Sequence, residues 1–268
     1  MSQQTRRISL TLIMLNILFI FLILPKLAHA TTLVEPSRFI FTLKPGERIT
    51  EAIKVTNTQD TEAEFVAVIY DWTLDDLDRL ITFKAGSRED TLEELIKFNP
   101  RRFKLAPGKS QYVRFTLTAP KNGKWMERKG IIFFEQETPP AENEIGAAIV
   151  TQVGTTIYLS FTETINAFRF FGSKVEAPPE GPPFAILDLA NEGLGHIRYK
   201  VSYKLIGKSG ALIYEDSLSE QIILPSSRRQ LTFTIAEQVA PGKYNLLLEI
   251  GFLGTEKKFN TSVPFTLF

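Results

Sequence analysis

One long strand-forming stretch constrains the fold of this chain more than any other feature. Residues 147–164 read AAIVTQVGTTIYLSFTET, with many β-branched and aromatic residues, no proline, and no charge before Glu163. Successive side chains of a strand point to opposite faces, and one alternate set here is mainly apolar: Ile149, Thr151, Val153, Thr155, Ile157, Leu159 and Phe161. The other set is mostly polar. The pattern predicts a half-buried strand, roughly twice the usual length of about five or six residues.

Such a strand has two possible environments. The chain's own second sheet can cover its apolar row, as in an ordinary sandwich core, or the strand can be an edge that another chain completes. A loop rich in proline and acidic residues precedes it at 138–146, and a second β-rich region follows it. The sequence leaves both environments open, and the function depends on which of them holds.

The rest of the chain after Thr31 also has β character. Short alternating segments are separated by turn sequences; the first runs over 34–43 and is interrupted by Pro36. One helical turn is predicted at 91–98, where Thr91 precedes Glu94 at the spacing of a capping box. Short strands at regular spacing are typical of a β-sandwich.

The segments fall into two sets of about seven strands, the number that an immunoglobulin-like sandwich needs. The predicted fold is therefore all-β, with two tandem immunoglobulin-like β-sandwich domains over 31–165 and 166–268 after an N-terminal signal peptide. The sequence Ala-Pro-Gly-Lys recurs at 106–109 and 240–243. The proline-rich segment 177–183 is interpreted as a stiff connector close to the domain boundary.

The first 30 residues have the pattern of an export signal. Arg6 and Arg7 precede an apolar run from Ile8 to Leu24, and Ala28-His29-Ala30 matches a signal-peptidase site. We expect cleavage before Thr31 and a periplasmic location, with an uncleaved N-terminal anchor as the alternative.

Composition excludes several classes of function. Without residues 1–30 the chain has 28 basic and 30 acidic residues, a balance that does not favour nucleic acid or an anionic membrane. Cysteine is absent, and His196 is the only histidine after residue 30. A zinc site in any usual form is thereby excluded. A Ser-His-Asp triad would need His196, which we interpret as a solvated residue at the start of a strand.

No other catalytic or ligand-binding pattern stands out. An acidic cluster of Asp71, Asp75, Asp76 and Asp78 lacks the residue spacing of a calcium loop and is interpreted as a solvated hairpin tip. The sequence thus predicts a protein that is not an enzyme and uses no metal, cofactor or small-molecule substrate.

Several short motifs of the first domain occur in the order of a known family. They are Ser37-Arg38-Phe39-Ile40-Phe41, Ile53-Lys54-Val55-Thr56-Asn57, PRRFKLAPG at 100–108, Gln111-Tyr112-Val113-Arg114-Phe115, Glu127-Arg128 with Gly130 and Phe133, and Glu137-Thr138-Pro139-Pro140. Over 33–164 this combination resembles the N-terminal domain of periplasmic pilus-assembly chaperones, the PapD-like family. The second domain resembles that family only in being immunoglobulin-like.

The resemblance implies a boomerang-shaped chaperone of pilus or fimbrial subunits. Its long strand would be donated to a pilin-like or other β-rich secreted subunit, and an outer-membrane usher would be a further partner. By matching position, Ile149, Thr151 and Val153 would be the inserted row, and Ile157 would continue it. Main-chain hydrogen bonds would give affinity, and alternate side chains would fill the subunit's open groove.

The family also holds the subunit's terminal carboxylate between an arginine and a lysine. Arg38 stands at the arginine position, whereas Tyr158 stands at the lysine position, where its hydroxyl could donate one hydrogen bond. We expect Arg38 in the cleft between the domains with its guanidinium free or loosely paired; the alternative is an ion pair with Glu35. Lys129 replaces a family glutamate that ties the two domains together.

Two other functions remain open from the sequence. The chain could be a non-catalytic structural or adhesive immunoglobulin-like envelope protein whose long strand is paired internally, or an envelope-binding module. An open edge at 147–154 would favour the chaperone, and burial of the apolar row on both sides would favour the structural protein.

Overall fold

The computed structural model describes residues 31–75, 78–122, 125–138, 149–161, 164 and 166–268. The predicted signal peptide at 1–30, most of the loop at 138–146, and residues 147 and 148 of the long strand lie outside these residues. The described elements are all strands, β1 to β18. Within the described residues, no helix is long and apolar enough to span a membrane.

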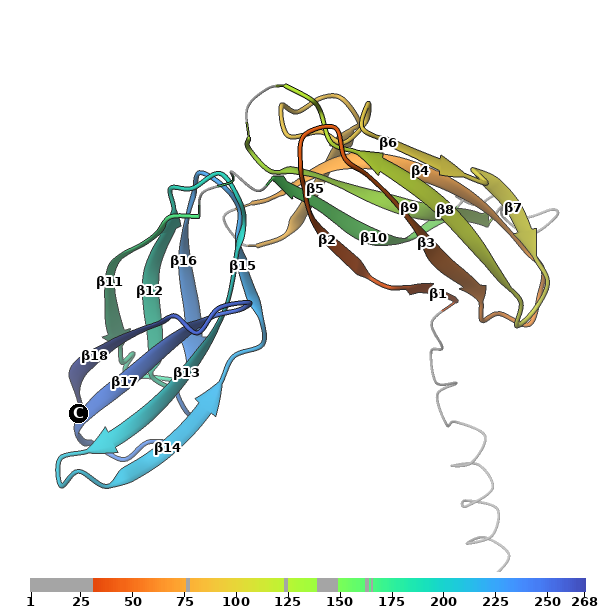
Figure 1. The fold of residues 1–268 in the computed structure, drawn as a ribbon. Helices are drawn as coiled ribbons and strands as arrows, with labels where there is room; N and C mark the ends of the chain where they lie inside the picture. The colour runs from red at the N-terminus through yellow and green to blue at the C-terminus, as the bar shows by residue number, and fades with distance from the viewer. Residues whose placement is uncertain (1–30, 76–77, 123–124, 139–148, 162–163, 165) are drawn as a thin grey trace, which may run out of the picture.

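Strands β1 to β10 form two sheets of the first domain (Figure 1). One sheet has the order β1 (Thr32–Glu35), β3 (Arg48–Asn57), β8 (Ser110–Thr118) and β6 (Ile96–Asn99). The other has the order β2 (Arg38–Leu43), β10 (Ile149–Phe161), β9 (Arg128–Thr138), β4 (Ala63–Leu74) and β5 (Leu80–Lys84), with β7 (Arg102–Leu105) also paired to β4.

Strands β11 to β18 form the two sheets of the second domain. A three-stranded sheet has the order β11 (Phe168–Glu176), β12 (Phe184–Asn191) and β16 (Ser227–Thr234). A five-stranded sheet has the order β14 (Leu212–Ser217), β13 (Ile197–Gly207), β17 (Gly242–Phe252) and β18 (Lys258–Leu267), with β15 (Gln221–Ile223) paired to β13. The predicted all-β fold of two immunoglobulin-like sandwiches is confirmed.

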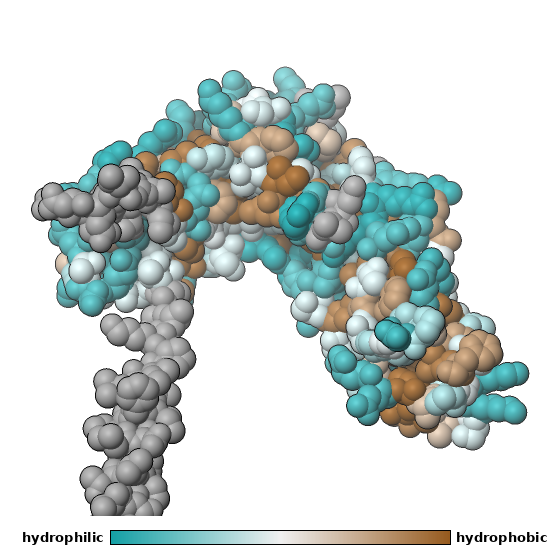
Figure 2. Space-filling view, turned by 180° about the vertical axis from the view of Figure 1, so that it is seen from behind, coloured by the Kyte–Doolittle hydropathy of each residue, from teal (hydrophilic) through white to brown (hydrophobic). Residues whose placement is uncertain are grey.

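Each sandwich encloses its own apolar core. Ile53, Phe65, Phe115 and Ile132 are among the fully buried residues of the first core, and Leu187, Val201 and Leu246 are among those of the second. A smaller apolar cluster joins the domains: Trp72, Ile131, Phe133 and Tyr158 of the first pack with Leu224 of the second. The two domains diverge at an angle from this junction and form separate lobes (Figures 1 and 2).

Three local predictions need correction. The segment 34–43 is two strands in different sheets, because proline has no N–H for a sheet ladder and the chain changes sheet at Pro36. The helical turn predicted at 91–98 is present but ends where β6 begins at Ile96, and Ile96 and Phe98 of that strand alternate with polar residues and face the core. The segment 177–183 joins β11 to β12 inside the second domain and is no connector between domains.

Candidate functional site: an open strand edge beside the domain junction

Strand β10 is paired along most of its length on one side and along about half of it on the other. Antiparallel pairing with β9 runs from Ile149 to Leu159. On the opposite side, β2 pairs in parallel with residues 156–161 only. Within the described part of the chain, residues 149–154 have no strand partner on that side, because β1 belongs to the other sheet. At about 3.3 Å per residue, the open edge is roughly 20 Å long.

The side chains of residues 150–153 on this edge are exposed or half-buried. Val153 is half-buried and packs against the first core, and Thr151 is also half-buried. Val150, on the opposite face, is 54% exposed. Ile149 lies at the start of the strand, where its backbone is paired with Thr138. The half-buried row is therefore the part of β10 that a further strand could cover.

The edge closes at Thr155. This residue is fully buried, and its hydroxyl donates a 2.8 Å hydrogen bond to the carbonyl of Pro36. The amide of Thr156 donates to the carbonyl of Ser37 at 3.1 Å, so the ladder with β2 begins here. Ile157 follows and is fully buried in the first core.

Tyr158 lies in the junction between the domains. Only 2% of its surface is exposed, and its ring lies edge-on to Trp72 at 5.7 Å and 4.4 Å from the ring of His196, centroid to centroid. Burial is the largest cause of the rise in the pKa of its hydroxyl. The side chain therefore packs the two domains together.

His196 is buried and paired, so its interpretation as a solvated residue is wrong. Its Nδ1 lies 2.5 Å from Oε2 of Glu127, a carboxylate of the first domain that is 1% exposed. The same oxygen accepts a 2.8 Å hydrogen bond from Ser160, and the amide of Glu127 donates to the carbonyl of Leu194 at 2.8 Å. Glu127 thus connects β10 with the turn between β12 and β13 of the second domain.

These three residue types also occur in hydrolase triads, but their arrangement differs. In a triad the histidine lies between the serine and the carboxylate and takes the serine proton. Here the carboxylate of Glu127 lies between Ser160 and His196 and accepts a hydrogen bond from the serine hydroxyl while facing the imidazole. The cluster holds the domains together and is not arranged to activate Ser160.

Arg38 makes an ion pair across the junction. Its Nη1 lies 2.5 Å from Oε1 of Glu220 in the second domain, so the guanidinium is not free but is paired through this one hydrogen bond. The alternative partner, Glu35, pairs instead with Lys54 at 3.5 Å. Glu220 also accepts two hydrogen bonds of 2.7 Å from Arg198.

The charges around Glu220 shift its titration. The hydrogen bond from Arg198 is the largest cause that lowers the pKa of Glu220 to about 2; partial burial opposes it, and the hydrogen bond from Arg38 adds to it. The carboxylate of Glu220 is therefore charged over the whole physiological pH range, and it accepts hydrogen bonds from both Arg38 and Arg198.

Lys129 pairs with Asp90 inside the first domain and lies over the ring of Trp72. The ties between domains are made by other residues, including a 2.5 Å ion pair between Asp78 and Arg229. A carboxylate tie between the domains is present at Glu127, two positions from Lys129, through its contact with His196.

The acidic cluster is not uniformly solvated. Asp71 is 1% exposed and accepts hydrogen bonds from the amide of Arg88 at 3.0 Å and the hydroxyl of Thr91 at 2.6 Å. Within the described residues, no three acidic or histidine side chains are grouped to hold a metal ion. Asp76 lies outside those residues.

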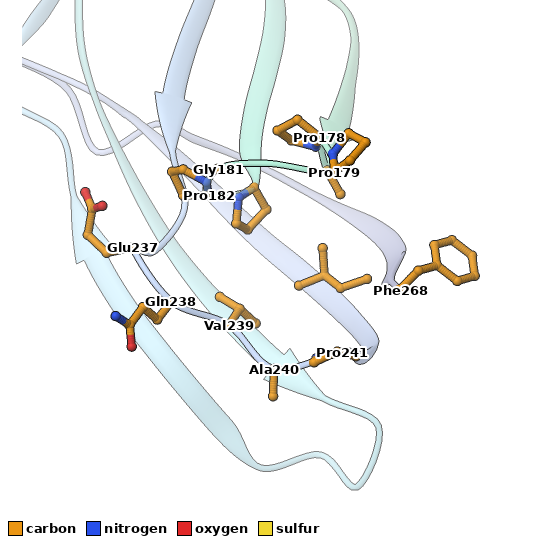
Figure 3. A pocket seen from close by; sticks show the side chains of 13 residues that line it. Pro178, Pro179, Gly181, Pro182, Glu237, Gln238, Val239, Ala240, Pro241 and Phe268 are labelled. Carbon is orange, nitrogen blue, oxygen red and sulfur yellow. The ribbon is translucent and has the colours of Figure 1, made fainter.

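Two surface hollows differ in their relation to the edge. A cavity of about 610 Å³ opens between the domains beside β2; Ile40, Ser160, His196, Arg198, Leu253 and Lys257 help to line it. Another, of about 790 Å³, lies between the 177–183 turn and residues 237–241 of the second domain (Figure 3). Figure 3 shows Phe268 pointing away from it. Only the first hollow adjoins β2 and β10.

No family model matches the sequence, and no curated protein matches it. Solved structures of fimbrial chaperone complexes are similar over most of the chain. A chain of the chaperone–tip adhesin complex of CFA/I fimbriae biogenesis has 13% identity and a TM-score of 0.47, covering 87% of this chain and 99% of that one.

Two further similar chains come from named organisms. One belongs to the CsuC–CsuE chaperone–tip subunit pre-assembly complex of archaic chaperone-usher Csu pili of Acinetobacter baumannii, with 13% identity, a TM-score of 0.45, and coverage of 87% and 98%. The other belongs to the SafA pilin–SafB chaperone complex of Salmonella enterica, with 12% identity, a TM-score of 0.44, and coverage of 90% and 99%. These similarities are similarities of fold.

Proposed function

We propose that this protein is a non-catalytic periplasmic chaperone that binds and caps pilus-type or other β-rich secreted subunits by strand addition. The observation that carries the proposal is the open edge of β10 at 149–154, on which Thr151 and Val153 are half-buried. An exposed edge offers unpaired N–H and C=O groups to another strand. A client that lacks one strand would pair with this edge and receive Ile149, Thr151 and Val153 in its own core.

Arg38 gives the added strand a preferred direction. Strand β2 runs parallel to β10 and begins at Arg38, opposite Thr156. A client strand added in the same direction would lie in line with β2, and its carboxyl end would meet Arg38. An antiparallel strand would bring its amino end there, and the guanidinium charge would repel it. We therefore infer a parallel client strand whose terminal carboxylate binds Arg38.

Ile157 and Tyr158 belong to the proposed site as supports. Ile157 fixes the paired half of β10 in the core, and Tyr158 fixes the same half against the second domain. The open half is consequently presented from a fixed base, which lowers the conformational entropy that this protein loses when a client binds. An outer-membrane usher would be a second partner of the loaded chaperone.

The test is affinity capture of the mature protein from the bacterial envelope with two matched variants. Val153→Asp places a charge in the row that enters the client, and Val150→Asp places the same charge on the exposed face of the same strand. We expect small β-rich subunits to co-purify with the parent and with Val150→Asp, and to be lost with Val153→Asp. Equal capture by folded Val153→Asp would exclude strand addition, and capture of no subunit would favour a structural envelope protein.

A further inference from the structure

We propose that Glu220 is an internal competitor of the client for Arg38. The inference rests on the proposed function and concerns how the same site is regulated. In the free protein a carboxylate already occupies the position where a client's terminal carboxylate would bind. Glu220 belongs to the second domain and Arg38 to the first, so the competing contact is also a tie between domains.

The contacts of Glu220 are unequal. Arg198 donates from Nε to Oε1 and from Nη2 to Oε2, each at 2.7 Å, and so forms a two-point contact. Arg38 donates from Nη1 alone and shares Oε1 with Arg198. Among the described residues, no other acceptor is hydrogen-bonded to the Arg38 guanidinium. A competing carboxylate would therefore displace Glu220 from Arg38 and leave it on Arg198, since an arginine fork holds a carboxylate best at two points.

The local charge balance favours a second carboxylate. Two guanidinium groups share one carboxylate, so the cluster of Arg38, Arg198 and Glu220 has one positive charge in excess. A client carboxylate would neutralise it. The neighbouring groups do not neutralise this charge, because Tyr158 is neutral and the carboxylate of Glu127 already contacts Ser160 and His196.

The cluster is also accessible. The side chains of Arg38, Arg198 and Glu220 are 40%, 31% and 29% exposed, respectively. Arg198 lines the cavity between the domains. A chain end that follows the open edge can thus reach Arg38 without unfolding the junction, which Glu127, His196 and the apolar cluster around Tyr158 still hold.

The test uses a defined peptide because it isolates the end group. The probe is an acetylated peptide of alternating Thr and Val that ends in Phe, made with a free carboxylate and with a terminal amide. Binding to the full mature protein is measured by isothermal titration calorimetry. For Glu220→Gln we expect the affinity for the carboxylate peptide to rise about tenfold, with no change for the amide. Glu215→Gln is the control, because that exposed acid pairs with Lys204 away from the junction.

The outcomes separate the two proposals. If the parent and Glu220→Gln bind both peptides equally, strand addition survives and the competition by Glu220 is excluded. If neither peptide binds to any variant, both proposals fail. If Glu220→Gln raises the affinity for both peptides alike, Glu220 affects the domain junction and not the recognition of the terminal carboxylate. The competition is then also excluded. Thermal unfolding of Glu220→Gln checks that the variant is folded.

Discussion

The two halves of β10 have one sequence pattern and two environments. Residues 149–154 and 156–161 both alternate apolar with mostly polar side chains. Pairing with β9 covers all of the first half and the second half as far as Leu159. Only the second half also pairs with β2. The comparison shows that a strand's own sequence defines which face is buried but not whether its edge is covered. That depends on Pro36, which lies over a hundred residues away and moves the chain to the other sheet.

The largest expected effect is a difference in how much the two halves of β10 contribute to stability. Ile157→Ala removes a fully buried side chain from the first core and should lower the free energy of unfolding by about 2–5 kcal/mol. Val153→Ala, at the half-buried open edge, should lower the free energy of unfolding by less than about 1.5 kcal/mol. Urea unfolding of both variants measures the difference. Equal losses would mean that the open half is as well packed as the closed half.

The next effect concerns binding. Arg38→Ala should weaken client binding at least tenfold, because a charge-assisted contact to a carboxylate contributes on the order of 1.5–3 kcal/mol. Arg102→Ala is the matched control, since that exposed arginine also pairs with a glutamate, Glu64, but lies on β7. Isothermal titration with a captured client measures both. Unchanged affinity for Arg38→Ala would exclude the terminal anchor while leaving the strand edge untested by this variant.

The fold and the strand were predictable because both depend on local patterns. Alternation identified β10, and the position of Pro36 already marked an interruption of the first strand. The polar contacts across the junction were not predictable: Arg38 and Glu220 are separated by 182 positions, and Glu127 and His196 by 69. Each is an ordinary polar residue in its own segment. Only the packing of two domains brings them together, and no local pattern encodes that packing.

The smallest expected effect is the contribution of Glu220 to the pH dependence of stability. Glu220 has a pKa lowered from 4.5 to about 2, chiefly by the hydrogen bond from Arg198, so its ion pairs stabilise the folded state above its unfolded pKa. This contribution should be lost as the pH falls from 4.5 through 2. Because the cluster is partly exposed, we expect less than about 1 kcal/mol.

Other carboxylates add to the acid-induced loss of stability, so a difference measurement is needed. The hydrogen bond from Arg228 lowers the pKa of Asp188, for example, and that residue titrates in the same direction. Urea unfolding of the parent and Glu220→Gln at several pH values between 5 and 2 isolates the contribution of Glu220. The parent should lose more stability than the variant over this interval, since only the parent can take up the extra proton. Parallel curves would mean that the ion pairs of Glu220 with Arg198 and Arg38 contribute little to the stability of the folded protein in solution.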